Sequence, residues 1–278
     1  MLATTALKAL LRANGLRLNK RLGQHYLIDP SLAVRLIEAC RLSPDDHVIE
    51  IGCGLGALTD LLENAVQRVV AVDIDRGICA LAKTRQAASR HVEIRCQDIL
   101  QFPWKAYAGW KVIGTIPYHI TSPILVALCE SARTLDDVWL GVQREVARRL
   151  IAKPSTKAYG RLTVLAQYHF EIQQAMPIAR GAFFPMPAVD SAWLHLRPRR
   201  LPAVSVADEA LFFRVVQAAF AQRRKTLVNG LQTLQMPRLT RAEAAQLMQR
   251  LGWSERLRGE TLSLEQFAQL ANAIQKRV

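Results

Sequence analysis

The feature that most constrains the fold is a short apolar run that ends in closely spaced glycines. Val48, Ile49 and Ile51 form a β-branched run typical of a strand buried on both faces. Gly52 and Gly54 follow, and apolar residues at helical spacing come next. Glycine is needed in such a turn because a side chain would block the approach of the backbone to a ligand. The pattern therefore predicts the strand, turn and helix that open a nucleotide-binding βαβ unit.

The next predicted strand, residues 68–73, adds a carboxylate to this unit. It ends in Asp73, about 20 residues after the first glycine, a spacing at which an acidic side chain can bind ribose hydroxyls. The pattern Gly52-x-Gly54-x-x-Ala57 also satisfies the looser dinucleotide fingerprint. The motif alone therefore leaves three interpretations open: an adenosyl cofactor such as S-adenosylmethionine, a dinucleotide such as NAD, or a tight turn without a ligand.

Predicted strands and helices alternate over the first two thirds of the chain. Further strands are expected at 92–96, 111–114 and 137–142, and this alternation predicts an α/β fold with a Rossmann-like, doubly wound, mostly parallel sheet. Asp73, Asp98 and Thr115 each follow a strand, where such sheets bind their ligands. A composition change at 198–202 predicts a boundary, with residues 1–200 forming the α/β domain and residues 201–278 a small all-helical domain.

The chain is strongly basic, with a formal net charge of +14. This charge favours an anionic polymer or a membrane surface as partner, although it could serve solubility alone. Residues 1–28 lack acidic side chains, which indicates an arm that faces nucleic acid, with an organelle transit peptide as the alternative. Two basic clusters could contact RNA phosphates or could be solvated helix faces: Arg144, Arg148 and Arg149, and Arg223, Arg224 and Lys225.

Other compositional features point to a soluble protein. The longest apolar runs are far too short to span a membrane. The five cysteines, Cys40, Cys53, Cys79, Cys96 and Cys129, show neither close pairing nor metal-ligand spacing. We therefore predict reduced, buried thiols in a cytosolic protein. The six histidines are also scattered, and no structural metal is expected.

The tetrapeptide Thr115-Ile116-Pro117-Tyr118 follows the fourth predicted strand. It resembles the [Asn/Asp/Ser]-[Pro/Leu]-Pro-[Tyr/Phe] element of enzymes that methylate exocyclic amino groups of bases. Adenine N6 is a poor nucleophile because its lone pair is delocalised into the ring. A side-chain oxygen and a backbone carbonyl can accept hydrogen bonds from N6 and orient it, while an aromatic ring can stack on a flipped base. Standing alone, the tetrapeptide could also be a Pro-Tyr turn at a strand end.

With the glycine turn, Asp73 and Asp98 in the same order, the chain is similar to the bacterial small-subunit rRNA adenine N6-dimethyltransferases over about residues 16–275. Further matching segments lie at 20–27, 142–149, 157–162, 183–191, 220–226 and 258–263. The resemblance implies a class I S-adenosylmethionine-dependent methyltransferase that dimethylates two adjacent adenines near the 3′ end of small-subunit rRNA. It further implies a cytoplasmic monomer that acts on the immature 30S subunit during ribosome biogenesis.

The resemblance also implies a role for each matching residue. Thr115, Ile116, Pro117 and Tyr118 would form the catalytic turn, and Phe183 would sandwich the target adenine with Tyr118. The implied cofactor-binding residues are His25, Leu27, Glu50, Gly52, Gly54, Asp73, Ile74, Asp98 and Thr115. From the residues alone, Asp98 could instead cap a helix, Phe183 could be plain core, and Glu50 could order the glycine turn.

Thr115 departs from the family, which usually has Asn at this position. A hydroxyl offers one rotatable oxygen instead of a planar carbonyl, so we hypothesise retained activity with a slower second methylation. His25 also stands where the family usually has Asn. Two alternatives to the small-subunit enzyme are a large-subunit rRNA adenine methyltransferase of the macrolide-resistance type and a ribosome-assembly factor with weakened catalysis.

Overall fold

The computed structural model describes residues 4–19, 22–222 and 224–276, and its internal contacts divide the chain into two units. Unit 1 comprises Met1–Ala147 and Glu171–Pro198, and unit 2 comprises Arg148–Phe170 and Arg199–Val278. The sequence predicted a single boundary near residue 200. Residues 148–170 instead pack with the C-terminal helices, because Tyr159, Val164 and Tyr168 are buried in the core of that unit.

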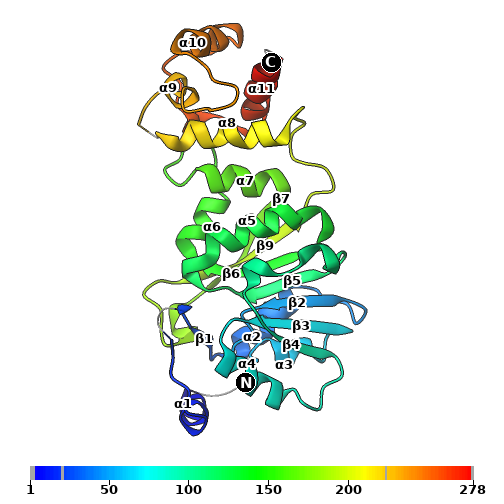
Figure 1. Cartoon of the computed structure of the whole chain (residues 1–278). Coiled ribbons are helices and arrows are strands. Elements are labelled where there is room, and N and C mark those ends of the chain that lie inside the picture. The colour runs from blue at the N-terminus through cyan, green and yellow to red at the C-terminus, as the bar shows by residue number, and fades with distance from the viewer. Residues whose placement is uncertain (1–3, 20–21, 223, 277–278) are drawn as a thin grey trace. The chain divides into compact units, whose positions relative to one another are not determined.

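A seven-stranded sheet forms the centre of unit 1, in the order β4-β3-β2-β5-β6-β9-β7 (Figure 1). Strands β2 to β6 pair in parallel, and β9 runs antiparallel to β6. The prediction of a doubly wound, mostly parallel α/β sheet is therefore confirmed. The strands are β2 (His47–Ile51), β3 (Arg68–Asp73), β4 (Val92–Cys96), β5 (Lys111–Thr115), β6 (Val138–Gln143), β7 (Phe170–Ile178) and β9 (Ser191–Pro198).

Two antiparallel segments add a small second sheet, in which β1 (Tyr26–Leu27) pairs with β8 (Phe183–Phe184). The sequence analysis did not predict this sheet, because two-residue strands carry no periodicity. It also missed β7, most of whose residues are exposed or half-buried and therefore lack the apolar signature of a buried strand.

Helices of unit 1 connect successive strands, as the sheet order requires. Asp29 and Asp75 cap α2 and α4 by accepting backbone hydrogen bonds, which explains why both helices begin where they do. The helices are α1 (Thr4–Ala13), α2 (Pro30–Ala39), α3 (Thr59–Leu62), α4 (Arg76–Arg85), α5 (Thr121–Ser131) and α6 (Arg144–Leu150), with 3₁₀ turns η2 (Ile99–Gln101), η3 (Trp104–Tyr107), η4 (Tyr118–Ile120), η5 (Ala132–Thr134) and η6 (Arg180–Ala182).

The basic N-terminal arm is partly helical and anchored by apolar side chains. Leu7 and Leu11 of α1 are buried in a small cluster with Tyr26, Leu55 and Ile78. The basic residues at positions 20 and 21 lie outside the described residues. The packing of α1 explains how a segment without acidic residues is still held on the protein.

Unit 2 is a bundle of helices around an apolar core. Phe212, Leu247 and Phe267 are buried at its centre. Its helices are α7 (Arg161–His169), α8 (Glu209–Ala221), α9 (Leu227–Leu231), α10 (Arg241–Arg250) and α11 (Leu264–Gln275), with the 3₁₀ turn η7 (Gly259–Thr261). Capping boxes at Thr240 and Ser263 start α10 and α11.

Four of the five cysteines are buried, but Cys96 is exposed at the end of the edge strand β4. The prediction that the thiols are buried is therefore wrong for Cys96, because an edge strand has a neighbour on one side only. Among the residues that the structure describes, no cluster of three His, Cys, Asp or Glu side chains could hold a metal ion. Nor does any described helix have the length and apolar character needed to cross a membrane.

Candidate active site

All thirteen residues predicted to bind cofactor, to form the catalytic turn or to stack on the target adenine line one pocket of unit 1. The pocket lies at the carboxyl ends of β2, β3 and β5, where Ile51, Asp73 and Thr115 end the strands. The β1–β8 sheet contributes Leu27 and Phe183 to the same pocket. The fold therefore brings together residues that are spread over more than half of the sequence.

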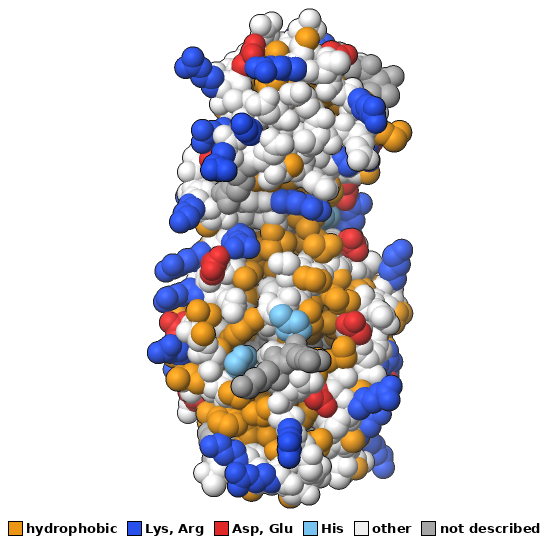
Figure 2. Space-filling view, turned by 60° about the vertical axis from the view of Figure 1, so that its left-hand side comes forward, with side chains coloured by type: hydrophobic (Ala, Val, Ile, Leu, Met, Phe, Trp, Pro, Cys, Tyr) orange, Lys and Arg blue, Asp and Glu red, His pale blue; other side chains and the backbone are white. Residues whose placement is uncertain are grey.

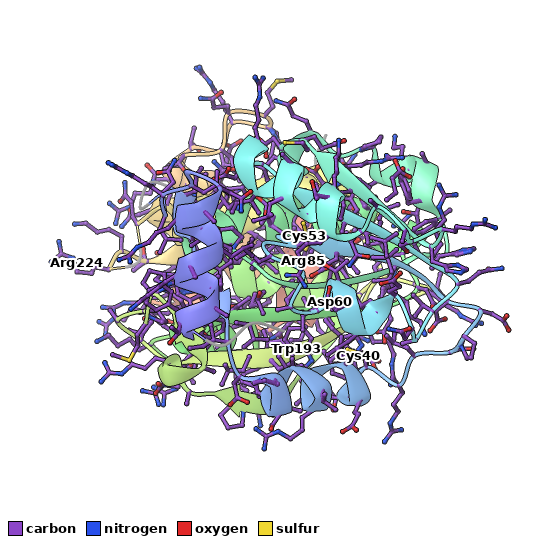
Figure 3. All side chains as sticks on the ribbon, turned by 90° about the horizontal axis from the view of Figure 1, so that it is seen from below. Cys40, Cys53, Asp60, Arg85, Trp193 and Arg224 are labelled. Atoms are coloured by element: carbon purple, nitrogen blue, oxygen red, sulfur yellow. The ribbon has the colours of Figure 1, made fainter. Side chains whose placement is uncertain are left out.

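The glycine turn after β2 requires backbone conformations that other residues rarely adopt. Gly52 and Gly54 have φ angles of +72° and +52°. A Cβ atom on Gly54 would lie 2.9 Å from Cδ1 of the Tyr26 ring. The turn is fixed from outside by Arg85, which donates to the Leu55 carbonyl and forms an ion pair with Asp60 at 2.8 Å (Figure 3).

Replacing Gly54 with alanine should lower both the melting temperature and the affinity for an adenosyl cofactor. The added methyl group meets the Tyr26 ring in addition to the strain of a positive φ. Thermal unfolding and titration calorimetry measure the two effects. Gly109→Ala is the matched control, because Gly109 has φ +78° but open space around its Cβ position. Equal destabilisation by both substitutions would contradict the proposed contact with Tyr26.

Asp73 is held in a defined orientation at the end of β3. Its Oδ2 accepts a hydrogen bond from the Gly54 N–H at 3.0 Å, and its Oδ1 accepts one from the Asp75 N–H at 3.0 Å. Burial raises the pKa of Asp73, and these backbone donors act in the opposite direction. Next to it, Ile74 is 49% exposed. A fixed carboxylate beside an exposed apolar side chain is suited to a ribose with an attached purine.

Glu50 is an ionisable residue in the centre of the sheet and is 1% exposed. Its Oε2 accepts a hydrogen bond from Thr59 Oγ1 at 2.5 Å, which ties β2 to α3. Burial raises the pKa of Glu50 from 4.5 to about 8, and the Thr59 bond opposes this shift. Both Glu50 and Asp73 line the pocket, so it contains two carboxyl groups whose charge is costly in the unliganded protein.

The free energy of unfolding should depend on pH through Glu50. Because its pKa is higher in the folded than in the unfolded chain, the folded chain binds more protons between pH 4.5 and 8. Stability should therefore fall as pH rises through this window, by on the order of a few kcal/mol. Glu50→Gln should remove this component. Denaturant titrations of both proteins at pH 5 and 8.5 measure it, and identical pH dependence of the two would refute the assignment.

Asp98 both caps a 3₁₀ turn and lines the pocket, two roles that the sequence analysis gave as alternatives. Its Oδ1 accepts a hydrogen bond from the Leu100 N–H at 2.9 Å, so it caps the 3₁₀ turn η2. It also lines the pocket. The capping interpretation is confirmed, and binding of an adenine amino group by Asp98 stays a prediction.

The turn that follows β5 presents the Thr115 side chain beside β6. Thr115 pairs with Gly141, and a Cβ on Gly141 would lie 3.1 Å from the Thr115 methyl carbon. The methyl group therefore faces β6. Within the turn, the Pro117 carbonyl accepts hydrogen bonds from the Ile120 N–H and from Thr121 Oγ1, both at 3.3 Å. Because Gly141 has no side chain, the Thr115 methyl group can occupy the space beside β6.

The Tyr118 ring contacts one other aromatic ring and shares the pocket with Phe183. His25 stacks on Tyr118 with ring centroids 5.5 Å apart, and its Nδ1 lies 2.6 Å from the Pro185 carbonyl oxygen. Phe183 lines the pocket but is only 5% exposed and belongs to the core of unit 1. Phe183 is thus both packed in the core and part of the pocket wall, and its contact with a target base stays a prediction.

The basic clusters lie on the surface. Arg144 is exposed and forms an ion pair with Asp190 at 3.3 Å, while Arg148 and Arg149 follow on the same helix, α6. Arg224 and Lys225 are exposed in the loop between α8 and α9, and the Arg224 side chain extends outward (Figure 3). Arg223 lies outside the described residues. On the face in Figure 2, Lys and Arg side chains outnumber acidic ones.

Several pocket residues were not singled out from the sequence. Tyr26, Gly141 and Ser191 all line the pocket. Ser191 ends the segment 183–191 that matches the family, which is the signal that could have found it. Gly141 has no sequence signal, because its importance follows from the pairing of β6 with β5.

The parallel sheet, the glycine turn after its central strand and the acidic residue after the next strand define the class I S-adenosylmethionine-dependent methyltransferase fold. The structure is similar to a dimethyladenosine transferase from Plasmodium falciparum, with a TM-score of 0.77 and 23% identity over 91% of this chain and 98% of that one. It is also similar to the 23S rRNA methyltransferase ErmE, with a TM-score of 0.66 and 26% identity over 90% and 99% of the two chains.

Sequence comparison narrows the class. The sequence model of the family described as "Ribosomal RNA adenine dimethylase" matches residues 15–276, and the chain belongs to this family. Proteins named ribosomal RNA small subunit methyltransferase A from Geobacillus thermodenitrificans and Geobacter metallireducens are each 38% identical to it. The first alignment covers 96% of this chain and 94% of the relative, and the second covers 95% and 98%.

Proposed function

We propose that this protein transfers methyl groups from S-adenosylmethionine to N6 of two adjacent adenines near the 3′ end of small-subunit rRNA. The observation that carries the proposal is one pocket that joins the Gly52–Gly54 turn and Asp73 to the Thr115–Tyr118 turn. The relatives named small subunit methyltransferase A, which align over nearly the whole chain, support the choice of substrate. The site would then act in the cytoplasm, on an immature 30S subunit, as a monomer.

The residues of the pocket fit an adenosyl cofactor. Asp73 presents a fixed carboxylate to a ribose diol, the half-exposed Ile74 offers an apolar face to a purine, and Asp98 offers an acceptor to its amino group. The positive φ angles of Gly52 and Gly54 allow a ligand to approach the backbone closely. Glu50 would receive a cationic ammonium group, which would offset the cost of its buried charge. His25 and Leu27 would close the same side of the pocket.

The Thr115–Tyr118 turn would bind and orient the target adenine. The Thr115 hydroxyl can accept one N6 hydrogen, and the Ile116 carbonyl can accept the other, because the Pro117 carbonyl is already bonded within the turn. Pro117 stiffens the turn, and Tyr118 offers a ring face to the base, with Phe183 closing the pocket. S-adenosylmethionine supplies an electrophilic methyl group when it is bound. The contribution of the turn is orientation, since an alkylated amine loses its proton readily to water.

We also propose that the basic clusters of α6 and of the α8–α9 loop bind RNA phosphates. Residues 201–278, which contain the second cluster, would then serve as an RNA-contacting region. Replacing both Arg224 and Lys225 with alanine should weaken RNA binding, because both cations are exposed and each could neutralise one phosphate. The slope of log affinity against log salt should fall by about 1.5 in magnitude. Filter binding at several salt concentrations measures it. Arg68→Ala is the control, because Arg68 is a cation of unit 1 that already pairs with Glu93 and belongs to neither cluster.

The decisive experiment is transfer of tritiated methyl groups to 30S particles that lack the modification, followed by mass analysis of the RNA. Dimethylation of two adjacent adenines in small-subunit rRNA is the expected result. Transfer to large-subunit RNA only would favour a 23S rRNA methyltransferase, the activity named for ErmE. Cofactor binding without any transfer would favour an assembly factor whose catalysis is weakened by Thr115. Accumulation of monomethyladenine would support a slow second methylation.

A further inference from the structure

We propose that Ser191 is a positioning residue that holds the side chain of Tyr118 in the position needed to stack on the target adenine, an inference that rests on the proposed function. Ser191 begins β9, which is separated from the β2 strand of the glycine turn by β5 and β6, and pairs with Gln143 of β6. No family motif used above gives it a role. Its side chain reaches the catalytic turn only because β9 inserts antiparallel beside β6.

The contact is short and joins a half-buried tyrosine to a buried serine. Tyr118 Oη and Ser191 Oγ lie 2.7 Å apart, and Ser191 is 1% exposed. Both residues line the pocket. The Tyr118 hydroxyl is therefore committed to a hydrogen bond with the protein, which leaves its ring as the part that can face a base. Burial raises the pKa of Tyr118, and the Ser191 bond opposes that shift, so the phenol stays protonated at neutral pH.

A second contact explains why one hydrogen bond is enough. His25 stacks on one face of the Tyr118 ring at 5.5 Å, and His25 is itself held by the Pro185 carbonyl oxygen at 2.6 Å. With that face covered and the hydroxyl end fixed by Ser191, the ring has one face left for a ligand. The Tyr118 phenol oxygen lies on the rotation axis of the ring, so the Ser191 bond restrains the swing of the whole side chain, while the His25 stack restrains the plane of the ring. Without Ser191, the side chain could move about its Cα–Cβ bond and carry the ring out of alignment with the base.

This geometry gives the Tyr118 hydroxyl a structural role and leaves contact with the base to the ring. A hydroxyl that is hydrogen-bonded to a buried serine is held away from the ring face where the base stacks. Removing the hydroxyl of Tyr118 should therefore have the same effect as removing the hydroxyl of Ser191. The two substitutions act on one interaction, and their effects should not add.

The test is a double-mutant cycle of Ser191→Ala, Tyr118→Phe and the combined variant, assayed on 30S particles that lack the modification. Each single variant should lower kcat by about 5- to 10-fold, as expected for one lost hydrogen bond, and the double variant should fall no further. The KM for RNA should stay within about twofold, since phosphate contacts dominate RNA affinity. The Kd for S-adenosylmethionine, measured by calorimetry, should not change.

A spectroscopic readout separates positioning from general destabilisation. With 2-aminopurine in place of the first target adenine, stacking on Tyr118 should quench fluorescence in the wild-type complex, and Ser191→Ala should reduce this quenching. Ser89→Ala is the matched control, because Ser89 Oγ bonds only within a turn before β4 and lines no part of the pocket.

The experiments distinguish a failure of the role of Ser191 from a failure of the proposed function. An active wild-type protein whose Ser191→Ala variant keeps kcat and quenching would overturn the role of Ser191 alone. Strictly additive losses in the cycle would overturn it as well. A wild-type protein that binds S-adenosylmethionine but methylates no small-subunit adenine would overturn the proposed function, and the role of Ser191 with it.

Discussion

Replacing Asp73 with alanine is expected to abolish binding of S-adenosylmethionine that calorimetry can measure. The wild-type carboxylate is half-buried and already oriented by the Gly54 and Asp75 N–H groups, so it can accept hydrogen bonds from a ribose diol without rearranging. Two charge-assisted hydrogen bonds contribute about 3–6 kcal/mol, which corresponds to a loss of about 100-fold or more in affinity. Methyl transfer should fall in parallel at any practical cofactor concentration.

Two further variants keep this prediction about Asp73 interpretable. Asp46→Asn is the control, because Asp46 lies at the amino end of β2, pairs with Lys111 at 2.6 Å and lines no part of the pocket. It should leave cofactor affinity unchanged. Asp73→Asn keeps the shape of the side chain and should retain part of the affinity. A folded Asp73→Ala protein with a Kd within about threefold of wild type would show that the cofactor is held elsewhere.

Replacing Tyr118 with alanine should separate catalysis from cofactor binding. The substitution removes the ring that stacks on His25 and bonds to Ser191, and with it the proposed face for the target adenine. Base–aromatic stacking contributes about 1–3 kcal/mol, so kcat/KM for RNA should fall by about 10- to 100-fold. Cofactor affinity should stay within about twofold, because Asp73 and the glycine turn are untouched.

The matched variant for this prediction is Tyr118→Phe, which keeps the ring and loses only the hydroxyl. Its loss should be smaller than that of Tyr118→Ala, because the stacking face remains. Single-turnover transfer and calorimetry on the three proteins measure both quantities. If Tyr118→Ala weakened cofactor binding as much as transfer, the ring would belong to the cofactor site, and a different residue would stack on the base.

The parallel strands of the sheet could be predicted because each one is marked by its own short stretch of apolar residues. Val48, Ile49 and Val70 come from strands that are buried on both faces, and such strands read as short apolar runs. Strand β7 has no such signature, since its side chains are mostly exposed, and only pairing within the sheet makes it a strand. The segment 148–170 was assigned to the wrong side of the boundary for a similar reason. Its apolar residues are equally compatible with either core, and only the packing assigns them to unit 2.

The pocket was predictable to the extent that its residues stand at strand ends. Asp73, Asp98 and Thr115 follow strands of a parallel sheet, and all parallel strands deliver their carboxyl ends to one edge. This reasoning does not predict that Ser191 and Gly141 line the pocket. Ser191 begins an antiparallel strand whose direction the alternation of strands and helices does not predict, and Gly141 lies within the parallel strand β6 and not at its end.

The sequence by itself determined the family, the class of fold and the set of side chains that can bind an adenosyl group and an adenine. These properties depend on residue type and on order along the chain, which are present in the sequence. Only the tertiary structure decided that His25 covers one face of Tyr118, that Ser191 holds its hydroxyl and that Gly141 makes room for the Thr115 methyl. Such contacts join residues that are distant in sequence, and their geometry is set by strand pairing and packing, which leave no periodic signal in the chain.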